Sequence, residues 1–275
     1  MKYSFATFVF VLLLSCFATL QVLCGQVAAR NQLSAPRVGV VRYADGRVYL
    51  LYGLPGSYVI GPRVLDDADS VSFSERGGLV ARKRSLVLLR SDFSLVGEFE
   101  TGESNPLLGM DGDLTTAIAW LPSTKRLVHW DGQAFAAVSA PDLSQEGDIS
   151  FVSKRDSKTA TLLLHSSNGF ASEASVSLET GQVTSVTAIG GAHGRLFRHG
   201  SFVLFPENHD LVITTPANGN TKKFPLAADD LRVERVSSDC LHLRSLKTQQ
   251  DWLLHFRGGD CDLAELPPPS AEGAK

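Results

Sequence analysis

The sequence predicts an all-β fold built from repeated units, and three observations support this prediction. First, groups of short β-prone runs and polar turns recur about every 40 residues, and the units begin near Arg37, Ala68, Leu107, Gly147, Gly194 and Asp230. Second, Asp-Gly and Asn-Gly pairs, the strongest short-range signal for a β-hairpin, separate several of these runs. Third, no stretch of about 11 residues after Arg30 keeps a helical hydrophobic period without a Gly, Pro or turn cluster. A strand-based repeat of this length is typical of a β-propeller. Six units predict six blades, and five or seven stay open because blade limits read from a sequence are approximate.

The turns between the β-prone runs place the predicted strands. In the first unit, Val38–Tyr43 and Arg47–Tyr52 flank Asp45-Gly46 and predict a hairpin. Further hairpin turns are predicted at Asp131-Gly132, Asn168-Gly169, Thr180-Gly181 and Asn218-Gly219. Short apolar runs, which predict strands buried on both faces, are Thr161–His165, Ser201–Phe205 and Asp210–Thr214.

The first 29 residues are expected to be a secretory signal peptide. Lys2 supplies a positive charge, Phe5–Leu14 is apolar, and Val27-Ala28-Ala29 offers small residues for cleavage before Arg30. Two alternatives stay open: lipidation of Cys16, and an uncleaved membrane anchor, because the apolar segment approaches the roughly 20 residues that a span needs. In each case the propeller domain, residues 30–266, is expected to be exported and therefore secreted or periplasmic. A membrane contact is expected only through one of these two alternatives.

The charge pattern excludes one class of partner. The formal net charge of the chain is −3, which gives no basis for binding nucleic acid. The basic run Arg82–Arg84 lies between two β-prone runs and is predicted to be a solvated turn. Alternating charges at Arg232, Glu234 and Arg235 are typical of an exposed edge strand, where charges prevent pairing with other chains. The proline-rich tail, residues 267–275, cannot bury apolar surface and is predicted to be disordered.

Two cysteines of the exported domain form a candidate disulfide. Cys240 and Cys261 are an even pair in an oxidising compartment, which favours a bridge. The predicted strand order places them two strands apart, at about 9–10 Å, whereas a disulfide needs Cα atoms within about 7 Å. Gly258-Gly259 precedes Cys261 and could carry it across. The even number of cysteines therefore predicts a disulfide bridge, whereas the expected distance between the two strands argues against it.

Several segments resemble known bacterial propellers. Val71–Ser74, Leu79–Ala81 and Ser85–Leu89 resemble the opening of a WD40-like or YVTN-type blade, and Leu178–Val183 resembles the Thr-Gly turn of the same group. Tyr52–Gly61 resembles the start of uncharacterised exported bacterial propellers. The resemblance implies the fold and a bacterial source, and it implies no specific activity. A Trp-Asp pair occurs once, at Trp130-Asp131, and no Gly-His pair is present, so the repeated signature of strict WD40 repeats is missing. Only Trp120, Trp130 and Trp252 are present, which argues against a quinone cofactor.

The sequence gives only weak evidence for a metal site, because each candidate ligand has a simpler structural explanation. Asp66, Asp67, Asp69, Asp111 and Asp113 could offer oxygen ligands to calcium, but aspartate is already favoured in turns. His193, His199 and His209 match no standard metal-site spacing, and His242 and His255 are expected to pair across neighbouring strands. No catalytic residue, cofactor site or metal site is assigned from the sequence.

The sequence favours a non-catalytic binding or protein-interaction module of the cell envelope, with an unidentified protein partner. Loops on a rigid scaffold carry function in such folds, so the longer turns at 66–69, 139–147 and 190–193 are the expected contact surface. One alternative is a calcium-dependent hydrolase or lyase of the lactonase-like propeller type, with Asp111 and Asn208 as candidate tunnel ligands. Another alternative is a structural component of an envelope assembly.

Overall fold

The structure, a computed structural model, describes residues 35–140, 143, 146–215, 219–226 and 230–269. The chain from Arg37 onward forms one compact unit. The predicted signal peptide and most of the predicted disordered tail lie outside the described residues. Within the described residues, no helix is long and apolar enough to cross a membrane.

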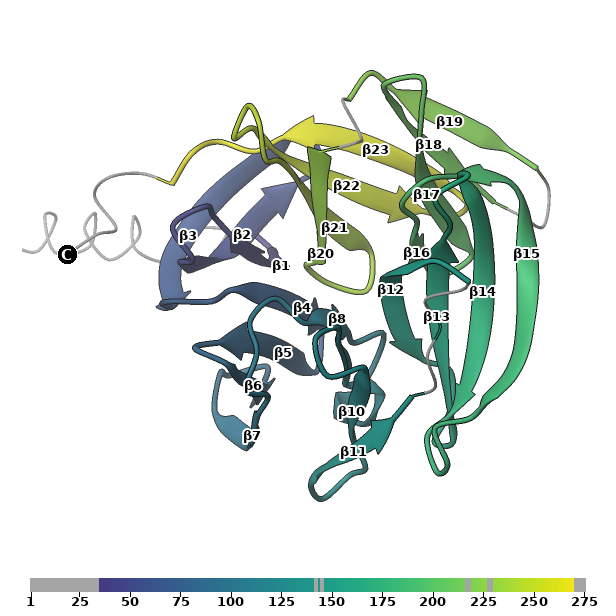
Figure 1. Ribbon diagram of the computed structural model, residues 1–275. Helices are drawn as coiled ribbons and strands as arrows, with labels where there is room; N and C mark the ends of the chain where they lie inside the picture. Colours follow the sequence, from purple (N-terminus) through teal and green to yellow (C-terminus); the bar gives the residue numbers. More distant parts are fainter. Residues whose placement is uncertain (1–34, 141–142, 144–145, 216–218, 227–229, 270–275) are drawn as a thin grey trace, which may run out of the picture. The chain divides into compact units, whose positions relative to one another are not determined.

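The compact unit consists of six antiparallel meanders, which are the blades of a propeller (Figure 1). Blade 1 contains β1 (Arg37–Arg42), β2 (Val48–Leu54) and β3 (Ser57–Leu65). Blade 2 contains β4 (Ser70–Ser74), β5 (Gly77–Arg82), β6 (Ser85–Arg90) and β7 (Leu95–Glu100). Blade 3 contains β8 (Leu107–Gly109), β9 (Ile118–Leu121), β10 (Arg126–Trp130) and β11 (Phe135–Ser139), with the short 3-10 helix η1 (Leu114–Thr116) before β9.

The second half of the chain repeats the four-stranded pattern. Blade 4 contains β12 (Asp148–Lys154), β13 (Thr159–His165), β14 (Phe170–Ser177) and β15 (Val183–His193). Blade 5 contains β16 (Phe197–His199), β17 (Phe202–Glu207), β18 (Asp210–Thr214) and β19 (Thr221–Phe224). Blade 6 contains β20 (Leu231–Arg235), β21 (Cys240–Ser245), β22 (Asp251–Arg257) and β23 (Asp260–Glu265). The predicted all-β propeller is confirmed.

The predicted Asp-Gly turns form because each aspartate and glycine has a separate role. Gly46 and Gly132 adopt φ angles of 78° and 113°, which glycine tolerates without a side-chain clash. The carboxylate of Asp45 accepts a hydrogen bond from the backbone N–H of Arg47 at 3.0 Å. Asp131 likewise accepts from the backbone of Gln133 at 2.7 Å. The local sequence therefore determines these hairpins without help from distant parts of the chain.

The core is divided into six apolar clusters, and each cluster lies between two neighbouring blades. Consecutive strand residues point to opposite faces, so one strand serves two clusters. In β1, Val40 packs with blade 2 and Val41 packs with blade 6. In β12, Phe151 packs with blade 5 and Val152 packs with blade 3. The remaining two clusters join blades 2 and 3 and blades 5 and 6. Blade 6 therefore packs against blade 1, and the ring is closed by side chains.

Blade 1 differs from the other five blades in a way that the sequence pattern did not predict. Its first strand, β1, runs antiparallel to β4. Arg37 at the start of β1 donates a hydrogen bond to Ser91 beyond the end of β6, and Gly46 beyond the end of β1 accepts from Ala68 just before β4. Among the described residues, blade 1 therefore lacks the first strand of the other blades. The unit predicted to start at Arg37 does start there, with a strand that runs in the opposite direction to the first strands of the other blades.

The first strands of blades 2 to 6 surround the axis, and β20 pairs directly with β4. This parallel pairing, between Arg235 and Ser72, joins blades 6 and 2 into one eight-stranded sheet. The strands approach one another very closely: a Cβ on Gly109 of β8 would lie 2.3 Å from the carbonyl oxygen of Val152 on β12. The centre of the propeller is therefore filled largely by backbone.

Candidate functional site

A pocket of about 260 Å³ lies on the axis, where the first strands of blades 2 to 6 begin. All five of these blades contribute to it, which places it at the centre of one propeller face. Its apolar walls include Val71, Leu107, Leu108, Phe151, Leu196, Phe197, Leu204, Phe205, Leu211, Leu231, Val233 and Leu246. Its charged residues are Arg195, Arg232, Glu234 and Arg235. We call this cavity the axial pocket.

Three residues that line the axial pocket are exposed: Asn105, Arg195 and Leu246. Leu246 follows β21 and is 53% exposed, which is unusual for a leucine beside an apolar cavity. Arg195 precedes β16 and is exposed, and no hydrogen bond or ion pair to it is found within the described part of the chain. The pocket thus presents one apolar group, one cationic group and the amide of Asn105 to an incoming ligand.

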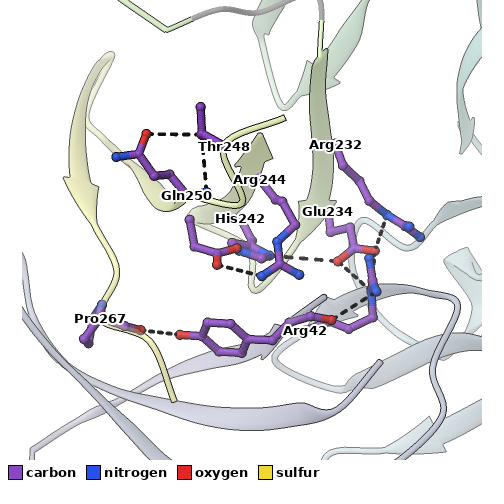
Figure 2. Close-up of polar contacts among 10 residues, drawn as sticks. Arg42, Arg232, Glu234, His242, Arg244, Thr248, Gln250 and Pro267 are labelled. Atoms are coloured by element: carbon purple, nitrogen blue, oxygen red, sulfur yellow. Dashed lines mark hydrogen bonds and ion pairs between the residues drawn. The ribbon is translucent and has the colours of Figure 1, made fainter. Parts of the chain in front are cut away.

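A buried ionic cluster forms one side of this region, between blades 6 and 1 (Figure 2). Glu234 on β20 accepts hydrogen bonds from the Nε atoms of Arg42 at 2.9 Å and of Arg232 at 3.0 Å. On the neighbouring strands, Asp251 Oδ1 lies 2.7 Å from His242 Nε2, and Asp251 Oδ2 accepts from Arg244 at 2.7 Å. We call these six residues the arginine cluster. It links the first blade to the last.

Burial and the neighbouring cations compete at Glu234. Burial alone would raise the pKa of the Glu234 carboxyl, but Arg42, His242 and Arg232 outweigh burial and lower that pKa to about 2. Glu234 is therefore ionised in the folded protein at neutral pH. Its charge is what makes the burial of the Arg42 guanidinium tolerable.

Asp111, one of the two candidate tunnel ligands, forms an ion pair. Its carboxylate lies 2.5 Å from Arg235 of β20, so the pair joins blade 3 to blade 6 across the axis. Asn208, the other candidate, lies in the turn between β17 and β18 with a φ of 51°. The structure therefore gives the two proposed tunnel ligands different roles.

Three of the remaining candidate calcium ligands, Asp66, Asp67 and Asp113, are engaged locally in turns and surface ion pairs. Asp113 accepts from the N–H of Thr115 at 2.8 Å and so caps helix η1. Asp66 pairs with Arg63 at 3.3 Å, and Asp67 pairs with Lys83 at 3.2 Å. Across the described residues, no group of three or more His, Cys, Asp or Glu side chains is placed to hold a metal ion.

The histidines are not gathered into one site. His199 is buried and stacks on Phe256 at 4.3 Å between ring centroids, and burial together with Arg235 lowers its pKa to about 3. His209 lies in the exposed β17–β18 turn, and the side chain of His193 lies outside what the structure describes. The predicted pairing of His242 with His255 is wrong, because the β21–β22 register places His242 opposite Leu253 and His255 opposite Cys240.

The predicted disulfide is not formed in this structure. Cys240 and Cys261 are free and buried on β21 and β23, with β22 between them. Cys240 lies opposite His255 and Cys261 opposite Phe256, and these consecutive residues point to opposite faces of blade 6. Cys240 packs against blade 1 and Cys261 packs against blade 5. The flexible Gly258-Gly259 turn does not overcome this separation.

Cys240 and Cys261 are expected to resist alkylation in the native protein and to react fully after unfolding without a reductant. Burial raises the pKa of each thiol to about 11, so little thiolate is present at neutral pH. Iodoacetamide labelling of the full chain in buffer and in guanidinium, followed by peptide mass spectrometry, measures both sites. A Cys240–Cys261 linked peptide in the unreduced, denatured sample would contradict the structure.

A second cavity, of about 750 Å³, opens between blades 4 and 5. Its walls carry hydroxyl groups and two ion pairs, Arg198 with Glu173 at 2.6 Å and Lys223 with Glu207. Its lining hydroxyl residues are Ser175, Ser185, Thr187, Thr214 and Thr221. Gly190 and Ala192 also line it, so the predicted contact segment 190–193 lies at this groove, within strand β15 rather than in a loop. The ion pairs satisfy four of the five charged side chains of this groove, and the fifth is Arg155.

Sequence reasoning misplaced the charged residues of β20. Arg232, Glu234 and Arg235 were expected on an exposed edge, but β20 is the first strand of blade 6, and Glu234 and Arg235 are each only 5% exposed. This run stands at the start of the last repeat unit, where the other blades have their innermost strand. Its position in the repeat could therefore have identified β20 as an inner strand. The other predicted contact segments, 66–69 and 139–147, do not line the axial pocket, and residues 141–142 and 144–145 lie outside the described residues.

Comparison with known proteins supports the fold and no closer relationship. No protein-family model and no curated protein matches the sequence. A chain of a nidogen/laminin complex is similar in structure with a TM-score of 0.51 and 12% identity, covering 82% of this chain and 92% of that chain. A chain of hydrazine synthase from Kuenenia stuttgartiensis has a TM-score of 0.42 and 12% identity, covering 82% and 79% of the two chains. Kluyveromyces lactis Hsv2 has a TM-score of 0.40 and 9% identity, covering 80% and 79%. At these identities the similarity shows a β-propeller fold alone.

Proposed function

We propose that the protein is a non-catalytic interaction module of the cell envelope or extracellular space, which recognises a partner protein through the axial pocket. The observation that carries this proposal is an apolar cavity at the centre of a rigid face, with the exposed Leu246 at its opening. Apolar cavities with a few placed polar groups are the usual form of a recognition site. The export of the chain rests on its N-terminal sequence pattern.

Rigidity supports this role. The ring is closed by six apolar interfaces and by the arginine cluster, so a partner that binds to the axial pocket meets a preformed surface. Binding to a preformed surface avoids the entropic cost of ordering it. The first strands of five different blades line the pocket together with residues of β17 and β18. The close packing of the first strands at the axis keeps the lining residues in place.

The Leu246→Glu variant is expected to lose capture of the partner, because it places a carboxylate beside the apolar wall that the partner must cover. The full chain is used as bait on the envelope fraction of its source cells, with chemical cross-linking and quantitative mass spectrometry. Leu95→Glu is the matched control, since Leu95 is a similarly exposed leucine (56%) on β7 of blade 2. Wild type and Leu95→Glu should capture the same protein.

Two results would overturn the proposal. One is capture by Leu246→Glu at the wild-type level. The other is a tightly bound stoichiometric metal ion in the purified protein together with hydrolase or lyase activity, which would favour the alternative of a metal-dependent enzyme.

A further inference from the structure

We propose that the axial pocket recognises an acidic segment of the partner, with one carboxylate bound by Arg195 and Arg232 and an adjacent apolar side chain packed against Leu246. This inference rests on the proposed function and specifies the chemistry of its ligand. The partner is a protein segment in which an apolar residue and a Glu or Asp residue are neighbours.

The first argument is the charge balance beside the pocket. The arginine cluster holds three guanidinium groups, those of Arg42, Arg232 and Arg244, against two carboxylates, those of Glu234 and Asp251. Arg232 and Arg244 lie directly opposite each other on β20 and β21, and like charges in that position repel. One positive charge is therefore left without a carboxylate in a region that is largely closed to water.

The second argument is the unsatisfied hydrogen-bonding capacity of the cluster. Arg244 is 5% exposed, and its Nε and Nη1 atoms have no hydrogen-bond partner within the described residues. Its guanidinium carbon lies 5.5 Å from the centre of the Tyr43 ring, a cation–π contact that replaces only part of the lost hydration. The arginine cluster therefore has more cationic hydrogen-bond donors than its carboxylates can satisfy.

The third argument is the position of the groups that can reach a ligand. Arg232 belongs to the cluster, lines the axial pocket and keeps 29% of its side chain exposed. Arg195 lines the same pocket from blade 5 and is exposed. A carboxylate between them would supply the missing negative charge, and its hydrogen bonds to guanidinium groups would be charge-assisted.

The fourth argument is size. A cavity of about 260 Å³ is smaller than the roughly 300–1,000 Å³ of typical small-molecule sites. It can hold about one large side chain. A protein segment that inserts one apolar side chain and places its neighbouring carboxylate on the rim uses both the apolar walls and the arginines.

Two labelled heptapeptides test the proposal: Gly-Ser-Leu-Glu-Glu-Ser-Gly and the same peptide with both glutamates replaced by lysine. Binding to the full chain is measured by fluorescence anisotropy at low and high salt. The acidic peptide should bind at least about tenfold more tightly than the basic peptide. Its affinity should fall as salt rises, because Arg195 is exposed to screening ions.

A variant and a matched control test the role of Arg195 in binding the acidic peptide. Arg195→Glu should weaken binding of the acidic peptide at least about tenfold. Arg76→Glu, at an exposed turn beyond the end of β4 that lies away from the pocket, should leave binding unchanged. Circular dichroism of each variant confirms that the fold is intact.

Each contrary outcome has a distinct meaning. Equal binding of the acidic and basic peptides, or no binding of either at millimolar concentration, overturns the inference about charge. If Leu246→Glu loses partner capture while Arg195→Glu retains it, the proposed function stands and this inference is wrong. If free glutarate displaces the peptide at equal concentration, the site binds a small carboxylate and the assignment of a protein segment is wrong.

Discussion

Replacing Glu234 with glutamine is expected to reduce the free energy of unfolding by about 3–5 kcal/mol. Glutamine has nearly the same shape as glutamate, so packing is preserved and the lost quantity is the negative charge. Arg42, whose side chain is 6% exposed, would then be buried without a counter-charge. Arg232 would lose its carboxylate partner and keep only its hydrogen bond to the backbone carbonyl of Asp69. Chemical denaturation of the wild-type and variant chains, compared by midpoint and slope, measures the effect.

Two controls make this prediction specific. Glu100→Gln removes a glutamate at the exposed end of β7 and should change the free energy of unfolding by less than about 0.5 kcal/mol. Arg42→Met combined with Glu234→Gln should cost less than the sum of the two single changes, because the double variant no longer buries Arg42 unpaired. A Glu234→Gln variant as stable as Glu100→Gln would show that the arginine cluster does not hold blades 1 and 6 together.

The same residue predicts part of the acid sensitivity of the fold. The pKa of Glu234 is lowered from its ordinary value of 4.5 to about 2 in the folded protein. Between these values the unfolded chain binds a proton that the folded chain does not. The stability contributed by Glu234 is therefore fully present above about pH 4.5 and is lost as the pH falls toward 2. The stability of Glu234→Gln should fall less steeply than that of wild type in this range.

The fold could be predicted from the sequence where the signal is local. Gly46 and Gly132 adopt positive φ angles that their Asp-Gly pairs encode within a few residues. The apolar runs of β13 and β18 are buried on both faces because each blade packs between two neighbours, so a continuous apolar run was sufficient to identify them. All six expected unit starts lie within three residues of the first strand of a blade.

The arginine cluster could not be predicted because its partners are distant in the chain. Arg42 and Glu234 are separated by 192 positions. The same alternation of charges along β20 would fit a strand at an exposed edge or a strand at the axis. Only the closure of the ring, which depends on distant parts of the chain, places β20 at the axis. The reversed direction of β1 could not be predicted for a similar reason. The sequence of a hairpin does not show which two strands of a blade the hairpin forms.

Gly109→Ala is expected to destabilise the propeller by about 1–3 kcal/mol or more, because a single methyl group would be inserted between two inner strands. The new Cβ would lie 2.3 Å from the carbonyl oxygen of Val152 and 3.1 Å from Ile118 Cγ2. The carbonyl belongs to the backbone of β12 and cannot rotate away, so β8 and β12 must separate. Both strands line the axial pocket, and the shift should therefore also weaken binding at that site.

Gly190→Ala is the matched control for Gly109→Ala, because a Cβ on Gly190 of β15 meets nothing within 4 Å. Chemical denaturation should show a large loss for Gly109→Ala and almost none for Gly190→Ala. Equal stability of the two variants would show that the strands at the axis are farther apart than the structure places them. A loss at Gly109 alone would establish that close backbone packing holds the axial pocket in shape, since the two substitutions differ only in what surrounds the added methyl group.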